Sequence, residues 1–156
     1  MRSVWRIAAL AAVLGMAPLA ASAQQSYGDW AKQCEPAPDG RERCYLIQTV
    51  QADSKPIMVV IVAYSPERDR VAAMIDVPLG MDIPAGLKVR ADNVEKDIAF
   101  EQCLPTGCRA MLPMDDAIIS ALKRGAKAAI TGRDRDGASV ELPISATGFD
   151  EAFGAL

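Results

Sequence analysis

The chain has 156 residues, with 17 Lys and Arg, 20 Asp and Glu, four Cys and no His. The absence of His excludes Ser-His-Asp and Cys-His catalysis and every His-ligated metal or haem site. The net charge of −3 argues against nucleic acid and anionic membrane surfaces as partners, since both are bound by neutralising phosphates with Lys and Arg. The length predicts one domain.

Residues 1–23 have the pattern of a secretory signal peptide. Two Arg near the start precede an apolar run, and Ala21-Ser22-Ala23 is a cleavage site of the A-x-A type. We expect cleavage after Ala23, which leaves a mature chain over residues 24–156 that forms a single β domain. An uncleaved anchor is the alternative. No other apolar run is long enough to cross a bilayer, so we expect no transmembrane segment in the mature chain.

The mature chain begins with a pattern typical of short strands. Residues 28–34 and 44–51 are the first two expected strands, and a turn rich in Pro and Gly separates them. Residues 57–64 are apolar without interruption and rich in β-branched side chains, which predicts a buried central strand rather than a helix. After a turn, residues 71–77 are expected to return as a fourth strand.

Further along, apolar and polar residues alternate in the way that places one face of a strand in a core. The expected strands here are residues 87–92, 97–101, 107–114, 126–133 and 140–146. Pro143 cannot donate to a strand ladder, so the last of them is expected at a sheet edge. Asp136-Gly137 just before it predicts a hairpin turn.

One helix is expected over residues 116–124. Asp115 can cap its first turn, and the apolar Ile118 and Leu122 share one face. Gly125 can adopt the left-handed conformation that ends a helix.

The C-terminal segment, residues 148–156, is expected to add a helical turn that buries Phe149 and Phe153. Nine short strands and one helix predict a mainly β fold. The expected architecture is an antiparallel β-sandwich or a flattened barrel with one short helix over about residues 115–124.

All four Cys lie in the expected mature chain, and an even number of Cys in an exported protein predicts disulfides. Of the three possible pairings we favour the local one, Cys34 with Cys44 and Cys103 with Cys108, because each would close a short loop of turn-forming residues. Neither spacing is the C-x-x-C of redox enzymes, and only the second is close to zinc-ligand spacing. Redox and metal roles remain the alternatives.

Four weaker patterns carry no clear chemistry. Residues 120–123 match S-x-x-K, but the S-D-N and K-T-G strings that accompany that nucleophile are missing. Residues 134–137 resemble a calcium loop that lacks acidic residues at its first and last ligand positions. Met111 and Met114 are better explained by packing than by a soft metal, and the adjacent Asp115 and Asp116 by helix capping. We therefore expect no enzyme, no cofactor, and no catalytic or metal-binding residue.

A set of short motifs follows in order along residues 27–153. The motifs are Gly28-Asp29-Trp30 with Cys34, Cys44 with Gln48, Val77-Pro78-Leu79-Gly80 with Ile83-Pro84 and Gly86-Leu87, Cys103-Leu104-Pro105 with Gly107-Cys108, Met114-Asp115-Asp116, Leu122 with Gly125, and Pro143 with Ser145 and Gly148-Phe149. With the four Cys in register, this ordered set resembles the invasion-associated locus B family of small exported proteobacterial proteins.

The resemblance implies an exported, non-enzymatic protein, since that family has no agreed catalytic residues. Its founding members are linked to bacterial entry into host cells, although many members occur in free-living bacteria. We expect a periplasmic, outer-membrane-associated or secreted protein that binds an unknown envelope or host-surface protein through a sheet face or edge. An envelope thiol-disulfide factor and a small-ligand carrier are the alternatives.

Overall fold

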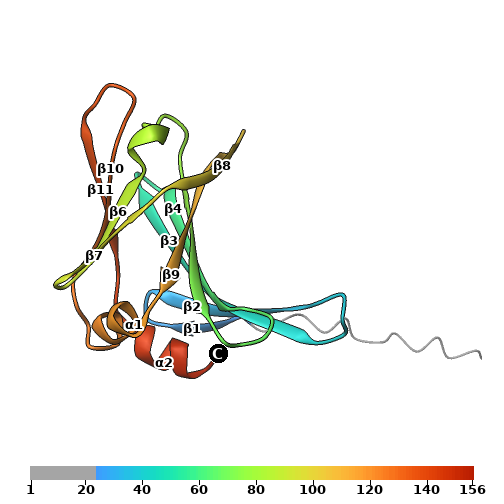
Figure 1. The fold of residues 1–156 in the computed structure, drawn as a ribbon. Coiled ribbons are helices and arrows are strands. Elements are labelled where there is room, and N and C mark those ends of the chain that lie inside the picture. The colour runs from blue at the N-terminus through green and yellow to red at the C-terminus, as the bar shows by residue number, and fades with distance from the viewer. Residues whose placement is uncertain (1–23) are drawn as a thin grey trace, which may run out of the picture.

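The computed structural model describes residues 24–156 and shows a mainly β protein (Figure 1). In spatial order the large sheet contains β1 (Gln25–Tyr27), β2 (Trp30–Pro36), β3 (Glu42–Ala52), β4 (Lys55–Tyr64), β5 (Val71–Val77), β9 (Gly107–Met114) and β8 (Phe100–Leu104). The small sheet contains β11 (Ser139–Ile144), β10 (Ala128–Arg133), β6 (Leu87–Ala91) and β7 (Val94–Ile98). The remaining elements are η1 (Ile83–Ala85), α1 (Asp116–Lys123) and α2 (Phe149–Gly154).

All neighbouring strands are antiparallel, and the two sheets pack face to face without closing into a barrel. The predicted fold class is therefore confirmed, in its sandwich form. The expected signal peptide and its cleavage site after Ala23 lie outside the described residues. Among residues 24–156, no helix is both long and apolar enough to cross a membrane.

Within residues 24–156 the structure corrects the number of strands, which is eleven rather than nine. β1 was not expected, because three residues at a sheet edge are too few to show an alternation. The strand expected over residues 97–101 is in fact two, β7 in the small sheet and β8 in the large one, and the chain changes sheets at Ala99. Gly28 and Asp29 were expected inside the first strand but form the turn between β1 and β2.

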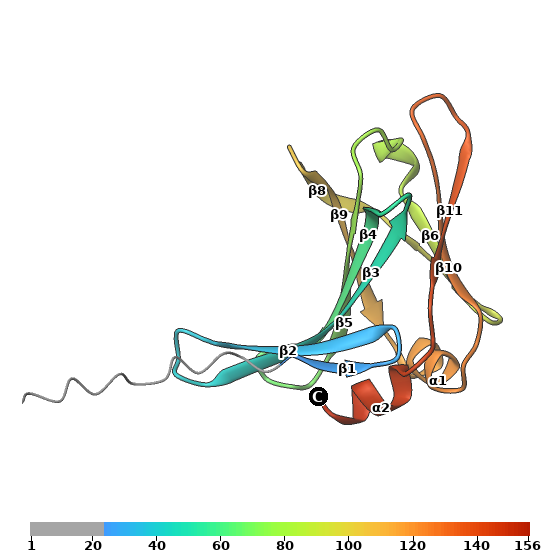
Figure 2. The same cartoon turned by 180° about the vertical axis from the view of Figure 1, so that it is seen from behind.

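The helical elements also differ from the expectation. η1 was not predicted, and the C-terminal turn is a short helix, α2, that buries Phe149 but leaves Phe153 only half-buried. The two α-helices lie together at one end of the sandwich, below both sheets in Figures 1 and 2. The residues of α1 that point into the core are Ile118, Ala121 and Leu122.

The core lies between the inner faces of the two sheets. Along β4, Met58, Val60 and Val62 are buried, whereas Ile61 and Ala63 point to the outer face and are half-buried. The uninterrupted apolar run therefore forms a central strand, as predicted, but one whose outer face no described element covers.

The last hairpin forms as the sequence predicts. Gly137 has a left-handed φ of 83°, and the Asp134 carboxylate accepts hydrogen bonds from the amides of Asp136 and Ala138 at 3.0 and 2.8 Å. Pro143 lies on β11, at the edge of the small sheet, opposite Ala129. The segment that resembles a calcium loop is therefore a hairpin turn stabilised by its own carboxylate.

The start of α1 is fixed by two contacts of Asp115. Its carboxylate accepts a hydrogen bond from the Ile118 amide at 3.0 Å, which confirms the predicted cap. It also forms an ion pair with Lys96 of β7 at 2.6 Å, so the helix is attached to the small sheet.

Replacing Asp115 with Ala should lower the free energy of unfolding by about 1 kcal/mol, because the Ile118 amide loses its acceptor. The control Asp116→Ala removes a charge from the same helical turn, where no cap bond exists, and should cost about 0.5 kcal/mol. Denaturant unfolding of the two variants measures the difference. Equal losses would contradict the assigned cap.

The cap should also depend on pH. The hydrogen bond from Lys96, followed by that from the Ile118 amide, lowers the pKa of Asp115 from its ordinary value of 3.8. A carboxyl with a lowered folded pKa stabilises the protein above the unfolded pKa, and this contribution disappears as the pH falls through the folded pKa. The stability difference between wild type and Asp115→Ala should therefore shrink in acid.

Candidate binding surfaces

The two sheets are joined, at the side where no strands pair, by the side chain of Gln48. This is the one buried polar side chain among the described residues. Its amide nitrogen donates to the main-chain oxygen of Ser145 at 3.1 Å, and its oxygen accepts from the Ser145 amide at 2.9 Å. Gln48 lies on β3 and Ser145 follows β11, so one side chain supplies the pair of bonds that a neighbouring strand would make.

Two further side chains complete this connection, which we call the Gln48 latch. Trp30 is buried and donates its indole N–H to the same Ser145 oxygen at 2.8 Å. The Ser145 hydroxyl donates to the Asp29 carboxylate at 2.5 Å and accepts from the Thr147 amide at 3.1 Å. Every polar group of Ser145 is therefore satisfied.

Two glycines allow the chain to approach the latch closely. Gly28 has a φ of 57°, and a Cβ at this position would lie 2.7 Å from the Thr147 oxygen. Gly148 has a φ of 80°, and a Cβ there would collide with the Tyr27 oxygen. Both positions favour Gly, because side chains at left-handed φ are strained and here no space is left for them.

The first and last motifs of the sequence thus meet in space. Asp29, Trp30, Gln48 and Ser145 are hydrogen-bonded around one peptide, and Trp30 packs edge-on against Phe149 at 5.2 Å between ring centroids. This group holds the sandwich together and leaves no polar atom directed at a ligand, because none of its buried side-chain nitrogens or oxygens lacks a partner.

Replacing Gln48 with Leu should lower the free energy of unfolding by about 2–3 kcal/mol, because it leaves the Ser145 amide without its acceptor in a buried position. The control Gln51→Leu, on an exposed position of the same strand, should change stability by less than about 0.5 kcal/mol. Thermal and denaturant unfolding measure both. A Gln48→Leu protein as stable as the control would refute the role of the latch.

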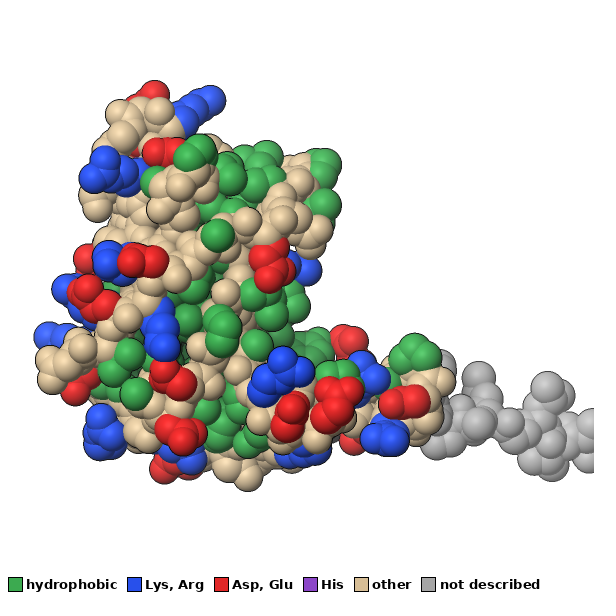
Figure 3. Space-filling model, in the orientation of Figure 1, with side chains coloured by type: hydrophobic (Ala, Val, Ile, Leu, Met, Phe, Trp, Pro, Cys, Tyr) green, Lys and Arg blue, Asp and Glu red, His purple; other side chains and the backbone are tan. Residues whose placement is uncertain are grey.

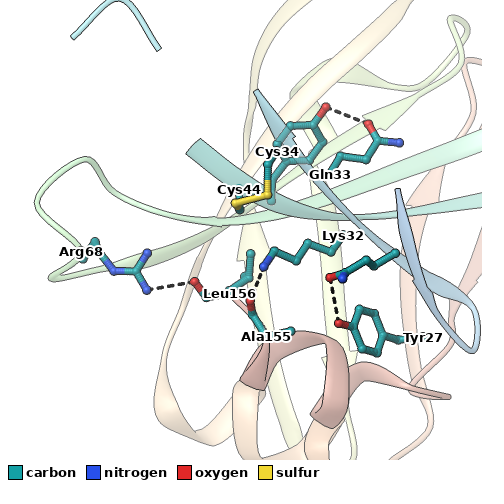
Figure 4. The surroundings of a disulfide bond; sticks show 10 residues. Tyr27, Lys32, Gln33, Cys34, Cys44, Arg68, Ala155 and Leu156 are labelled. Atoms are coloured by element: carbon teal, nitrogen blue, oxygen red, sulfur yellow. Dashed lines mark hydrogen bonds between the residues drawn. A yellow bond between two sulfur atoms is a disulfide. The ribbon is translucent and has the colours of Figure 1, made fainter. Parts of the chain in front are cut away.

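The structure contains both local disulfides. Cys34–Cys44 joins β2 to β3, and Cys103–Cys108 joins β8 to β9, each between residues directly opposite in the strand register. Figure 4 shows the first bridge above the C-terminal segment, where Lys32 donates to the main-chain oxygen of Ala155 at 2.6 Å.

Replacing both Cys103 and Cys108 with Ser should lower the free energy of unfolding by about 2 kcal/mol. Replacing both Cys34 and Cys44 should lower it by about 3 kcal/mol, because this bridge closes the longer loop. Periplasmic yield should fall in the same order. Unfolding under non-reducing conditions provides the measurement, with reduced wild type as the control. Unchanged melting temperatures would contradict a structural role for the bridges.

Of the other residues considered from the sequence, Asp115, Asp116, Ser120 and Lys123 line one open hollow of about 740 Å³, whereas the two Met are separated. Met111 points to the outer face of the large sheet and Met114 into the core, so the two Met lie on opposite faces. Lys123 of the S-x-x-K pattern forms an ion pair with Asp150 at 3.2 Å and lies over the Phe153 ring. It attaches α1 to α2, which accounts for its position.

Three large apolar side chains are exposed at the end of the sandwich opposite the helices. Leu79 precedes η1, Ile83 lies in η1, and Leu104 is the last residue of β8, next to the β8–β9 turn. The three residues are 56, 40 and 48% exposed. Figure 1 shows η1 and the tip of β8 at this end, and Figure 3 shows hydrophobic side chains there. We call these three residues the apolar loop end.

The loops that carry the apolar loop end are held firmly. The Arg135 amide donates to the Gly80 oxygen at 2.9 Å, and the Asp82 amide donates to the Arg133 oxygen at 2.8 Å. These bonds attach the loop before η1 to the β10–β11 hairpin. The Cys103–Cys108 bridge closes the β8–β9 turn. The exposed side chains are therefore presented on an ordered framework.

A second apolar surface covers the outer face of the large sheet. Ile47, Ile61, Met74 and Met111 are register partners on four successive strands and form one continuous row. Beside it runs a row of mostly small side chains: Tyr45, Ala63, Ala72 and Pro113. Polar residues bound the other side, where Arg109 and Asp76 form a double hydrogen bond at 2.7 Å in each contact.

This outer face is hollowed. A furrow of about 440 Å³ follows the row of small residues, and the charged residues among those that line it are Arg70 and Glu101. A second hollow of about 420 Å³ lies between the outer face and the projecting β2–β3 arm, residues 33–45. Figure 3 shows hydrophobic side chains along the side of the upright body that faces the arm.

Neither surface was identified from the sequence. Leu79, Ile83 and Leu104 belong to motifs, but a sequence pattern does not tell which apolar residues of a turn stay exposed. The apolar outer face does have a signal in the sequence. Residues 57–64 are apolar on both faces of the strand, whereas a strand with one face in water alternates apolar and polar residues.

Two packed antiparallel sheets, a disulfide in each of two hairpins and a buried side-chain latch define a small disulfide-stapled β-sandwich protein. Residues 30–156 match the family described as "Invasion associated locus B (IalB) protein". The chain belongs to this family, which confirms the resemblance seen in its motifs.

Known proteins agree with this assignment. Two invasion protein B homologues, from two strains of Brucella abortus, are 25% identical over 113 residues, or 72% of this chain. The chain spans 65% of the length of these relatives in the match. The crystal structure of invasion associated protein B from Bartonella henselae has the same fold, with a TM-score of 0.74 at 20% identity over 86% of this chain and 94% of that one.

Proposed function

We propose that the chain is an exported, non-enzymatic protein that works in the periplasm or on the outer surface of a bacterium and binds a protein partner through the apolar loop end. One observation carries this proposal. Leu79, Ile83 and Leu104 are the large hydrophobic residues exposed among residues 24–156, and all three gather at one end. They also belong to the motifs on which the family resemblance rests.

Those motifs fall into two groups. The residues of the Gln48 latch are needed to build the fold, as their hydrogen bonds show. Leu79, Ile83 and Leu104 contribute little to the core, because about half of each side chain faces water. Single exposed Leu residues are ordinary, but three on one ordered end form a patch of the kind that binds partners. Ordered loops also lose little entropy on binding.

Export is supported by the leader at residues 1–23 and by two disulfides, which persist in oxidising compartments. The names of the relatives point to invasion of host cells, so a host-surface protein is one source of the partner. The bacterial envelope is the other.

The two alternative functions have less support. A carrier with a pocket between the sheets would need space there, but the gap among the core side chains is about 10 Å³, less than one small ligand requires. A thiol-disulfide factor of the common type would use a C-x-x-C pair, but the two bridges join Cys residues 10 and 5 positions apart, although Cys103 is exposed.

The proposal can be tested by photo-cross-linking from the apolar loop end. A photo-reactive residue at position 104 should give a discrete protein adduct in intact bacteria, or only after host cells are added; the first result indicates an envelope partner and the second a host partner. Replacing Leu79 and Ile83 with Asp in the same chain should reduce the adduct about tenfold, since both apolar contacts are lost.

The matched control is the same photo-reactive residue at position 141, on exposed β11. Adducts of equal yield from positions 104 and 141, or a yield that Leu79→Asp/Ile83→Asp does not change, would contradict binding through the apolar loop end.

A further inference from the structure

The outer face of the large sheet has the properties of a covered surface, although no described element covers it. The row formed by Ile47, Ile61, Met74 and Met111 consists of large apolar side chains, all half-buried by their neighbours alone. Antiparallel sheets with a solvated face carry polar residues there. An apolar outer face is what sheet-on-sheet packing against another layer requires.

The charges at this face indicate what the other layer is. Arg70 immediately precedes β5 and lies at one end of the furrow, whereas Glu101 of β8 lies at the other end, beside the Asp76–Arg109 row. A surface with one positive and one negative end matches a copy of itself turned by 180°. In a two-fold interface, residue i meets residue j and j meets i, so Arg70 of each copy would face Glu101 of the other.

The remaining charged pair on the face does not oppose such contact. Arg109 donates to both oxygens of Asp76 at 2.7 Å, so the two charges are already paired inside one chain. Glu101 adds only a weaker electrostatic attraction to Arg109 and forms no hydrogen bond with it. Covering a paired, hydrogen-bonded charge avoids the large cost of burying a lone one. Arg70, in contrast, has only an exposed contact with Asp69 at 3.5 Å and is free to turn toward another carboxylate.

The arm gives the surface its shape. Residues of the β2–β3 arm and Ile61, Ala63 and Met74 of the outer face line the same hollow. In Figures 1 and 2 the arm projects sideways from the lower end of the upright body, so face and arm together border a recess. A second copy placed by a two-fold axis would lie in this recess, with its own arm around the first body.

We infer that the chain forms a two-fold dimer through the outer face of its large sheet, with Arg70 of each copy paired to Glu101 of the other across the furrow. This interface is separate from the apolar loop end and leaves that end free. The inference goes beyond the proposed function and does not depend on it.

A charge exchange tests the pairing. The exported chain, purified with both disulfides formed, should show a reversible monomer–dimer equilibrium in sedimentation equilibrium. Arg70→Glu and Glu101→Arg should each weaken the dimer at least about tenfold, because like charges then meet across the axis. The double variant Arg70→Glu/Glu101→Arg should recover to within about threefold of wild type, since the opposite charges are restored in exchanged places.

Met74→Asp, at the centre of the row, should leave a folded monomer at about 100 µM. The control pair Arg135→Glu and Glu141→Arg makes the same charge changes on the β10–β11 hairpin and should leave the dissociation constant unchanged. A wild-type chain that is monomeric throughout, a double variant that stays as weak as the single ones, or a dimer that tolerates Met74→Asp would overturn the inference. Cross-linking from position 104 would be unaffected by these results, so the two proposals fail independently.

Discussion

The two hydrogen bonds between the side chain of Gln48 and the peptide of Ser145 are the constraint on which this fold depends. On one side of the sandwich the chain itself crosses from the small sheet to the large sheet at Ala99. On the other side no strands pair, and the end of β11 would leave main-chain groups without partners inside the protein. A buried amide can donate and accept at once, so Gln48 closes this side without a further strand.

The latch also shows which of the family motifs serve the fold and which are left for binding. Motifs far apart in the chain meet at Ser145, because Trp30 and Asp29 bind the same residue as Gln48. The side chains of these motif residues form hydrogen bonds within the latch. Gly28 and Gly148 beside them allow close backbone contact. The motif residues that do not serve the fold are the exposed ones at the opposite end, and it is there that we place binding. Besides the latch and the apolar loop end, the outer face of the large sheet is a third region. Its apolar residues lie opposite one another on neighbouring strands, and we infer that it binds a copy of the same chain.

Local features of this fold could be predicted from the sequence, because they depend on neighbours in the chain. The cap at Asp115, the turn at Gly137 and the edge position of Pro143 each follow from the chemistry of a few adjacent residues. Both disulfides fall within single hairpins, so short loops pointed to them. The latch could not be predicted, because it joins residues 97 positions apart through a side chain and leaves no periodic pattern. Nor could the change of sheet at Ala99, since the alternation continues through it, or the exposure of Leu79 and Leu104, which depends on how separate loops meet.

The most direct test of the account is hydrogen exchange at the Ser145 amide in the wild-type protein, measured by NMR. This residue lies beyond the last strand, where an ordinary chain segment would exchange quickly. If the Gln48 side chain accepts its hydrogen bond in a buried setting, the Ser145 amide should be protected about as strongly as the central strands of the large sheet, by a free energy close to that of global unfolding. Exchange at the rate of an open loop, with the strands still protected, would show that the latch does not hold the two sheets together.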